Sequence, residues 1–208
     1  MARIAPPHKL SAARWKNLRV GLLGGSFNPA HAGHMHIARQ AMIRFKLHAV
    51  WWVVSPGNPL KVKDLAGDLE ARVEAVSAFI GDTPNMVATG IEGQLKTRYT
   101  YDTLKQLRRH FPTTNFVWIA GMDNAVAFAR WDRWAKLPSI VPFVFFDRPP
   151  ASSKVRGKAV RQAKQIKQNV HAVRRGLSKQ DKGVYWMVDG RAVNLSSTEI
   201  RAKRPPKR

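Results

Sequence analysis

The sequence of 208 residues predicts a single-domain α/β protein, with a Rossmann-like, doubly wound, mainly parallel sheet and helices on both faces. Two observations predict the parallel sheet. Continuous apolar runs at residues 49–54 and 115–120 suit strands buried on both faces, and they alternate with segments of helical periodicity such as residues 69–80. A third observation is a glycine-rich turn between the first apolar run and the first helix, as nucleotide-binding α/β folds have.

The elements follow one another along the chain. The first strand covers residues 18–23, and a helix begins near Gly33, since apolar residues recur there every three or four positions. Thr100 is suited to capping a helix that runs to about His110, and Asp123 to capping a short helix at 125–128. Further strands are expected at residues 49–54, 85–88, 115–120, 142–146 and 184–188, and further helices at residues 69–80, 155–175 and 195–201.

The formal charge of +23 is the unusual feature of the composition. Much of the excess lies in residues 1–19, 154–182 and 201–208, and such runs are more often solvated faces or tails than surfaces that read nucleic acid. We therefore do not expect a nucleic-acid partner; a basic protein also attracts polyanionic substrates such as ATP. The expected organisation is a basic mobile leader at 1–18, the α/β domain at 19–203 and a basic tail at 204–208.

The chain has no cysteine, so disulfides and thiol chemistry are excluded. No segment approaches the roughly 20 apolar residues of a membrane span, and the basic amino-terminal segment lacks the apolar core of a secretory signal. We expect a cytoplasmic protein without a membrane partner. A homo-oligomer is left open.

The loop at residues 21–36 predicts an anion site. Glycine amides and a helix amino-terminus point at whatever binds before the first turn, and phosphate is the expected ligand. His31 and His34 are three residues apart, on one side of the helix, where two donors can neutralise charge that builds up as a P–O bond breaks. A metal site is not expected, because the histidine cluster contains no cysteine or carboxylate. The two commonest glycine-rich phosphate motifs, GxGxxG and GxxxxGK[ST], are absent.

Other candidate contacts follow the predicted strands, because open parallel sheets bind ligands at the carboxyl ends of their strands. Gly121 permits close backbone approach, and Asp123 is placed to accept hydrogen bonds from ribose hydroxyls, unless it only caps a helix. Trp131 either packs in the core or stacks on a flat heterocycle. The remaining candidates are Asn58 and Lys61 after the second strand, Arg148 for a phosphate or carboxylate, and a second phosphate site at Ser196 to Glu199.

The segment GGSFNPAHAGH (residues 24–34) resembles the GG[ST]F[DN]PxHxGH signature of the HxGH nucleotidyltransferase superfamily. Its members transfer AMP or CMP from a nucleoside triphosphate to a phosphate-bearing acceptor. Within the superfamily, residues 18–203 are similar to the bacterial nicotinate-nucleotide adenylyltransferases, through the segments YTYDTL, GMDNAVAFARW and SSTEIR. The segment SPGNPLK departs from that family's usual PPH[KR] ending.

The resemblance implies the substrates ATP and nicotinate mononucleotide, with Mg²⁺ bound mainly through the ATP phosphates, and no metal site on the protein. It implies three groups of site residues: His31, His34 and Arg201 for catalysis; Gly24, Gly25, Ser26, Phe27, Gly121, Asp123, Ser197 and Thr198 for ATP; and Asn58, Lys61, Thr100, Trp131 and Arg148 for nicotinate mononucleotide. Thr100 would act through its backbone amide and Trp131 by stacking.

The acceptor is an ionised phosphate, so in-line attack on the α-phosphorus of ATP needs no general base. The alternatives are another HxGH transferase, such as pantetheine-phosphate adenylyltransferase or a cytidylyltransferase, or a basic nucleic-acid-binding protein on the same fold. The sequence leaves open the preference for nicotinate over nicotinamide mononucleotide, and the roles of the leader and the basic helix.

Overall fold

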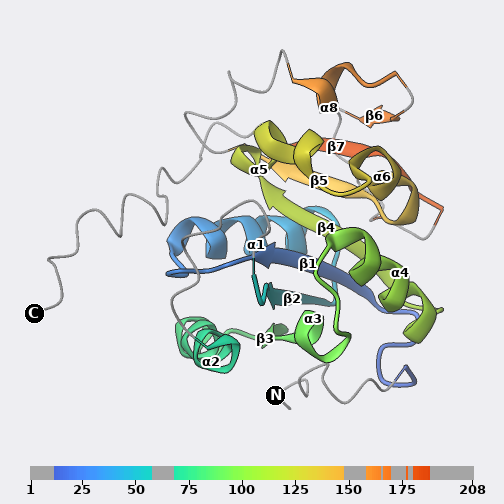
Figure 1. Ribbon diagram of the computed structural model, residues 1–208. Coiled ribbons are helices and arrows are strands. Elements are labelled where there is room, and N and C mark those ends of the chain that lie inside the picture. Colours follow the sequence, from blue (N-terminus) through green and yellow to red (C-terminus); the bar gives the residue numbers. More distant parts are fainter. Residues whose placement is uncertain are drawn as a thin grey trace, which may run out of the picture.

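The structure is a computed structural model, and it describes residues 12–57, 68–147, 158–164, 166–169, 177 and 180–187. One seven-stranded sheet with the order β3-β2-β1-β4-β5-β7-β6 forms its centre (Figure 1). Every pairing between neighbouring strands is parallel. The strands are β1 (Arg19–Gly25), β2 (Ala49–Val54), β3 (Met86–Thr89), β4 (Asn115–Gly121), β5 (Phe143–Phe146), β6 (Gln168–Asn169) and β7 (Val184–Met187).

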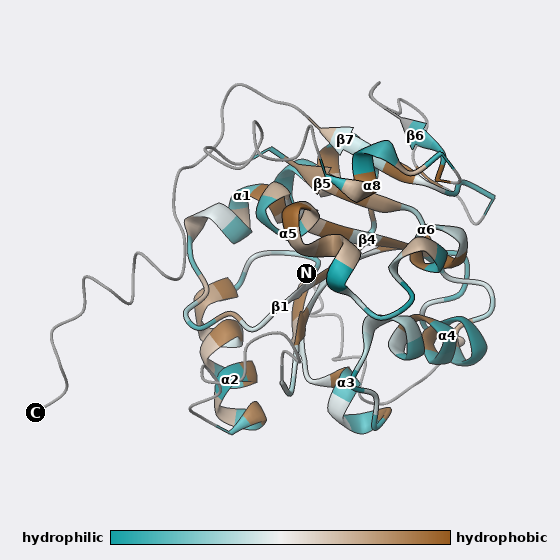
Figure 2. Ribbon diagram, turned by 45° about the horizontal axis from the view of Figure 1, so that its top comes forward, coloured by the Kyte–Doolittle hydropathy of each residue, from teal (hydrophilic) through white to brown (hydrophobic). Residues whose placement is uncertain are grey.

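Helices connect these strands. The α-helices are α1 (Ala32–Arg44), α2 (Leu69–Ile80), α3 (Ile91–Gln94), α4 (Thr100–His110), α5 (Met122–Ala127), α6 (Leu137–Ile140) and α8 (Ala159–Gln162), and the 3₁₀ helices are η2 (Phe128–Arg130) and η3 (Trp134–Lys136). The longer helices present their apolar side to the sheet, whereas the outward side of α4 is largely hydrophilic (Figure 2). None of the helices in the described part of the chain has the length and apolar character needed to cross a membrane.

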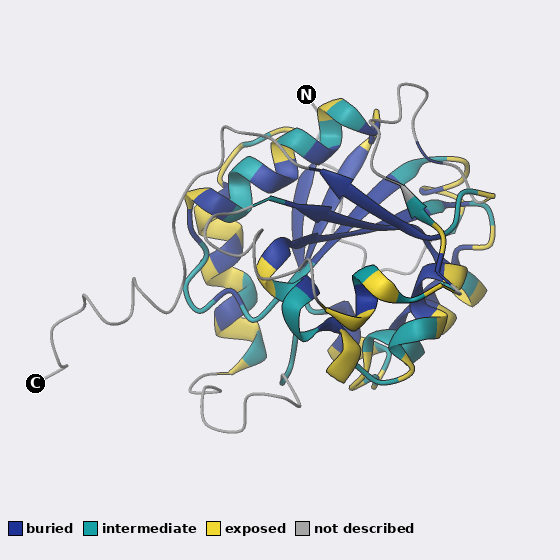
Figure 3. Ribbon diagram, turned by 90° about the horizontal axis from the view of Figure 1, so that it is seen from above, coloured by how far each residue is buried: buried dark blue, intermediate teal, exposed yellow. Residues whose placement is uncertain are grey.

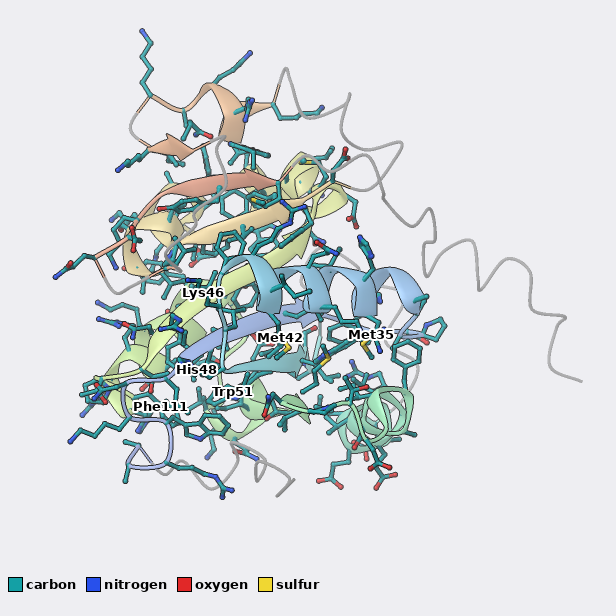
Figure 4. All side chains as sticks on the ribbon, turned by 180° about the vertical axis from the view of Figure 1, so that it is seen from behind. Met35, Met42, Lys46, His48, Trp51 and Phe111 are labelled. Atoms are coloured by element: carbon teal, nitrogen blue, oxygen red, sulfur yellow. The ribbon has the colours of Figure 1, made fainter. Side chains whose placement is uncertain are left out.

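The sheet is buried between two apolar clusters (Figure 3). Helices α1 and α2 cover one face, where Met35 and Met42 of α1 pack against the cluster (Figure 4). The other face is covered by α3, α4, α5, α6 and α8, with Trp51 and Phe111 in contact at a ring-centroid distance of 5.6 Å. Burial on both faces explains why the strands are continuous apolar runs.

The strand order reverses at β1. The chain proceeds outwards from β1 through β2 to β3, and then returns to place β4 on the other side of β1. The carboxyl ends of β1 and β4 therefore diverge into loops that lead to opposite faces, and this is the position where open α/β sheets bind ligands.

The predicted fold class is confirmed, and the six predicted strands lie within one or two residues of β1, β2, β3, β4, β5 and β7. The helix predicted at 155–175 is wrong. Helix α8 ends at Gln162, and Gln168–Asn169 is a strand that pairs with β7. The Gln168 side chain also donates to Val160 O and accepts from Trp186 Nε1, so contacts with other elements override the helical periodicity.

Residues 12–18, predicted from the sequence to belong to a mobile leader, are packed against the fold. Trp15 is 1% exposed and contacts Trp51 with a ring-centroid distance of 4.7 Å, and Thr114 Oγ1 donates to Trp15 O at 2.7 Å. Because Trp15 belongs to the core, this part of the leader prediction is wrong. Residues 1–11 and the tail at 204–208 lie outside the described residues.

Candidate active site

The glycine loop begins where β1 ends. Gly24 has the Trp118 ring of β4 directly beside it, and a Cβ atom at this position would overlap that ring. Trp118 in turn packs between Phe143, at 5.8 Å between ring centroids, and Trp131, at 6.2 Å. The absence of a side chain at Gly24 therefore allows β1 and an indole of β4 to lie in contact at the strand end.

The two histidines of the loop form the amino-terminal cap of α1. His31 is the N-cap residue, and its Nδ1 accepts from Gly33 N at 3.1 Å, while His34 Nδ1 accepts from His31 N at 3.3 Å. Their rings lie on one side of the helix with centroids 3.8 Å apart, as the spacing predicted. Because both Nδ1 atoms accept hydrogen bonds, this pattern assigns the proton of each neutral imidazole to Nε2, which becomes a hydrogen-bond donor.

Aromatic side chains hold the second imidazole. The rings of Phe27 and Trp52 lie 5.0 and 6.3 Å from that of His34, and 5.3 Å from each other. The Phe27 side chain is buried in the core, so any contact of this residue with a nucleotide would have to be made by its backbone. The aromatic pair restricts the rotamer of His34.

A hollow of about 120 Å³ opens between the glycine loop and the segments at 98–100 and 130–132. The described residues that line it are Gly24, Gly25, Ser26, Val53, Ser55, Gly57, Glu92, Arg98, Tyr99, Thr100, Trp118, Asn124, Arg130, Trp131 and Asp132. One end of the hollow thus offers backbone amides of the glycine loop, and its walls offer aromatic rings and two guanidinium groups. This combination suits a ligand with phosphate groups and a flat ring.

Neither Thr100 nor Asp123 is the N-cap of its helix. Helix α4 begins at Thr100 with Tyr99 as N-cap, so Thr100 is the first helical residue and its backbone N–H is one of those without a partner inside the helix. Helix α5 begins at Met122 with Gly121 as N-cap, and Asp123 lies in its first turn. A Cβ atom on Gly121 would overlap Asp123 Oδ1, so this glycine lets the carboxylate fold back towards the end of β4. Capping by the side chain therefore explains neither Thr100 nor Asp123.

The structure brings together five of the predicted site residues, since Gly24, Gly25, Ser26, Thr100 and Trp131 all line the hollow. His31, His34, Phe27, Gly121 and Asp123 lie at the same edge of the sheet, next to the carboxyl ends of β1 and β4, but are not among the lining residues. The other predicted residues, Asn58, Lys61, Arg148, Ser197, Thr198 and Arg201, lie outside the described residues.

Two buried charged residues were missed by sequence reasoning. Arg72 of α2 donates to Ser55 O at 2.6 Å and to Pro56 O at 3.2 Å, which ties the helix to the loop that lines the hollow. Glu92 of α3 is 5% exposed, and burial raises the pKa of its carboxyl to about 7. A raised pKa in a cleft marks a candidate functional group. The local sequence around each residue carries no motif; only three-dimensional packing buries them.

The described residues contain no group of three or more histidine, cysteine or carboxylate side chains that could hold a metal ion.

A parallel sheet with a glycine loop at its switch point, followed by a helix capped by two histidines, defines a nucleotide-binding protein of the nucleotidyltransferase class. The profile of the cytidylyltransferase-like family matches residues 22–203. A protein of Cereibacter sphaeroides named probable nicotinate-nucleotide adenylyltransferase is 43% identical over 185 residues, which are 88% of this chain and 96% of that protein. A protein of the same name from Methylorubrum extorquens is 48% identical over 132 residues, 64% of this chain and 71% of the other.

Solved structures agree on the fold. The nicotinic acid mononucleotide adenylyltransferase of Plasmodium falciparum, complexed with NaAD, superposes with a TM-score of 0.64 at 18% identity, over 89% of this chain and 83% of that one. The chain belongs to the nicotinate-nucleotide adenylyltransferase family, within the cytidylyltransferase-like proteins.

Proposed function

We propose that the protein transfers AMP from ATP to nicotinate mononucleotide, giving nicotinate adenine dinucleotide and pyrophosphate, a step of NAD biosynthesis. One observation carries the proposal. A glycine loop suited to phosphate and an aromatic wall suited to a flat ring, Trp131 with Thr100 beside it, line the same hollow. The names of relatives that are 43% identical over most of the chain support the same reaction. Since ATP is an intracellular nucleotide, we place the reaction in the cytoplasm.

Each substrate has its own part of the site in this proposal. Gly24, Gly25 and Ser26 hold ATP, and Phe27 contributes its backbone alone. Gly121 gives the nucleotide room at the end of β4, and Asp123 accepts hydrogen bonds from the ribose. Trp131 stacks on the nicotinate ring, and the backbone N–H of Thr100 donates to the nicotinate carboxylate. We assign Ser197, Thr198 and Arg201 to the triphosphate, and Asn58, Lys61 and Arg148 to the acceptor.

The chemistry is an in-line displacement. A phosphate oxygen of nicotinate mononucleotide attacks the α-phosphorus of ATP, and the bond to the bridging oxygen of pyrophosphate breaks. The acceptor oxygen is already ionised, so no protein base is needed. The enzyme positions the two substrates and stabilises the charge that develops on the phosphates, through the Nε2–H groups of His31 and His34 and the guanidinium of Arg201.

Magnesium fits this site as part of the substrate. Mg²⁺ binds well to phosphate oxygens and keeps several water ligands, so it reaches the site on ATP without a cage of protein carboxylates. When bound, it neutralises part of the triphosphate charge. The side chains of His31, His34 and Arg201 orient the phosphates around it.

The experiment that tests the proposal measures pyrophosphate release by the purified protein with Mg²⁺-ATP and three separate acceptors. We expect turnover with nicotinate mononucleotide, less with nicotinamide mononucleotide, and none with phosphopantetheine. Turnover with phosphopantetheine alone would leave the reaction type standing and overturn the acceptor. No release with any acceptor would overturn the proposed function.

A further inference from the structure

Glu92 is a buried acid in the wall of the hollow, and the reaction as described gives it no task. It lies in α3, 5% exposed, and lines the hollow together with Thr100 and Trp131. Thr103 Oγ1 lies 3.1 Å from Glu92 Oε1, and the Glu92 backbone carbonyl accepts from Thr97 N at 3.0 Å. Glu92 is therefore fixed to both ends of the segment at 97–103, which forms the wall beside it.

A network of two threonines gives the Glu92 carboxyl one side-chain hydrogen-bond donor. Thr103 Oγ1 contacts Glu92 Oε1, Tyr99 O at 3.2 Å and Thr97 Oγ1 at 2.8 Å. The Thr103 hydroxyl has one proton, whereas a carboxylate and a carbonyl oxygen can only accept. Thr103 Oγ1 donates to Glu92 Oε1 and so stabilises the carboxylate, but Tyr99 O competes for the same proton, which weakens this stabilisation. Burial acts in the opposite direction and is the larger effect, so it raises the pKa of Glu92 to about 7.

The other charged groups of the hollow do not neutralise Glu92. Arg98 and Arg130 line the same hollow but are exposed, so water screens them. Asp132 faces Arg133, with 3.6 Å between its Oδ2 and Arg133 Nε, and Asp102 of α4 lies 3.9 Å from Arg133 Nη1. Guanidinium groups stay protonated at all ordinary pH values. Among the charged residues that line the hollow, Glu92 is thus the one that is buried and has uncharged hydrogen-bond partners.

We propose that Glu92 sets the choice between acceptors at this site: as a neutral acid it admits the anionic ring carboxylate of nicotinate mononucleotide, and as a carboxylate it repels that anion and favours the neutral amide of nicotinamide mononucleotide. The inference rests on the proposed function. The physical reason is that two negative charges in a poorly solvated hollow repel each other strongly, whereas a carboxylate and an amide do not.

The consequence is a specificity that depends on pH. Between pH 5.5 and 8.5, the ratio of kcat/KM for nicotinate to that for nicotinamide mononucleotide should fall about tenfold, with a midpoint near the pKa of Glu92. Both acceptors carry the same phosphate and use the same ATP and Mg²⁺. Titration of the shared phosphate and of ATP therefore cancels in the ratio. The remaining pH dependence comes from the protein group that distinguishes a ring carboxylate from a ring amide.

Three variants test the residue. In Glu92→Gln, a neutral isostere whose amide oxygen can still accept from Thr103, the ratio should stay constant with pH. In Thr103→Val, the hydrogen bond that lowers the pKa of Glu92 is lost, so the midpoint should move to higher pH. Glu74→Gln removes an exposed carboxylate from α2 and should leave the profile of the wild type unchanged.

The outcomes separate this inference from the proposed function. Turnover with a ratio that does not vary with pH in the wild type, or varies equally in Glu92→Gln, would overturn the role of Glu92 and leave the function intact. If no acceptor is turned over, calorimetric titration of both mononucleotides at pH 5.5 and 8.5 still measures the preference. Absence of any binding, or the same preference at both pH values, would then overturn the inference.

Discussion

At the level of single residues, the two nitrogen atoms of each imidazole in the loop have different roles. The Nδ1 atoms of His31 and His34 satisfy backbone N–H groups at the start of α1, which assigns the proton of each neutral imidazole to Nε2, and the two rings lie on the same side of the helix. A capping role and a role in charge stabilisation therefore coexist, and loss of a histidine would remove both. Substitutions that mimic one nitrogen at a time can separate them.

The first prediction uses that separation at His34. Asparagine can place an acceptor near the Nδ1 position, and glutamine can place a donor near the Nε2 position. We expect His34→Asn to retain stability within about 1 kcal/mol and to lose about 100- to 1000-fold in kcat, the typical cost of one donor to a transition-state anion. His34→Gln should retain more activity and less stability. Steady-state kinetics and urea denaturation check the order, and full activity of His34→Asn would contradict the role in catalysis.

A second residue-scale prediction concerns the contact between β1 and β4. Gly24→Ala would place a methyl group on the Trp118 ring, which packs against Phe143 on its other side and has little room to move. Overpacking of this kind costs about 1 to 3 kcal/mol. Since Gly24 and Trp118 also line the hollow, the substrate affinity should fall with the stability. Denaturation and ATP titration measure the two effects; a Gly24→Ala protein as stable as the wild type would show that the indole can shift.

At the scale of elements, helix α2 holds the loop that follows β2. Arg72 is buried, and its guanidinium donates to the carbonyl groups of Ser55 and Pro56, two successive residues of that loop. Burial also lowers its pKa from the usual arginine value, opposed by the nearby Asp68. Ser55 and Gly57 line the hollow, so α2 shapes the site although it does not contribute a lining residue in the described part of the chain.

We therefore predict a combined effect of Arg72 on stability and substrate binding. Arg72→Met leaves two carbonyl groups without their donor and should cost about 1 to 3 kcal/mol in the free energy of unfolding. The KM of at least one substrate should rise severalfold, because the loop is no longer held. Arg39→Met, which removes an exposed arginine from α1, is the matched control and should change neither quantity. An unchanged KM in Arg72→Met would mean that the loop keeps its position without the guanidinium.

The elements also show what sequence reasoning can and cannot reach. The strands and the helices α1, α2 and α4 were predictable from the sequence. Burial on one or two faces produces a characteristic spacing of apolar residues along the chain. The segment at 155–175 has such a period, yet Gln168–Asn169 is a strand, since its pairing with β7 depends on residues far along the chain. Glu92 and Arg72 were missed for the same reason: a glutamate or arginine in a polar stretch is normally solvated, and only tertiary packing buries these two.

At the scale of the whole molecule, burial of Glu92 makes stability depend on pH. The pKa is 4.5 for an ordinary glutamate and about 7 here, so between these values the folded state binds more protons than the unfolded state. The contribution to stability is complete below about pH 4.5 and is lost as the pH rises through about 7, by roughly 3 kcal/mol in total.

Urea denaturation of the wild type and of Glu92→Gln at several pH values between 5 and 8 measures this contribution. The difference between the two proteins cancels the titration of all other groups. We expect Glu92→Gln to gain stability relative to the wild type as the pH rises. If the difference in the free energy of unfolding stayed constant between pH 5 and 8, Glu92 in the folded protein would be ionised, or neutral, over this whole range.

The net charge of +23 acts on the molecule as a whole. At the amino ends of the strands, basic residues face one another: burial and then the charge of Arg19 lower the pKa of His48, and burial and then Arg108 lower that of Lys182. His48 and Lys46 mark this edge in Figure 4. Repulsion of this kind opposes the compact state and is screened by salt.

The folded state should therefore gain stability when sodium chloride is raised from about 20 to about 200 mM, because the Debye length then falls to several ångströms. Urea denaturation at constant pH measures the change. Lys105→Glu lowers the net charge by two on the exposed side of α4 and places an acid one turn before Arg109, so it should raise stability at low salt and reduce the salt effect. Lys105→Arg keeps the charge and should behave as the wild type does. An unchanged denaturation midpoint in all three proteins would contradict this prediction. The excess charge would then be spread too widely to oppose folding, and the like-charge contacts at the strand ends would have no measurable cost in stability.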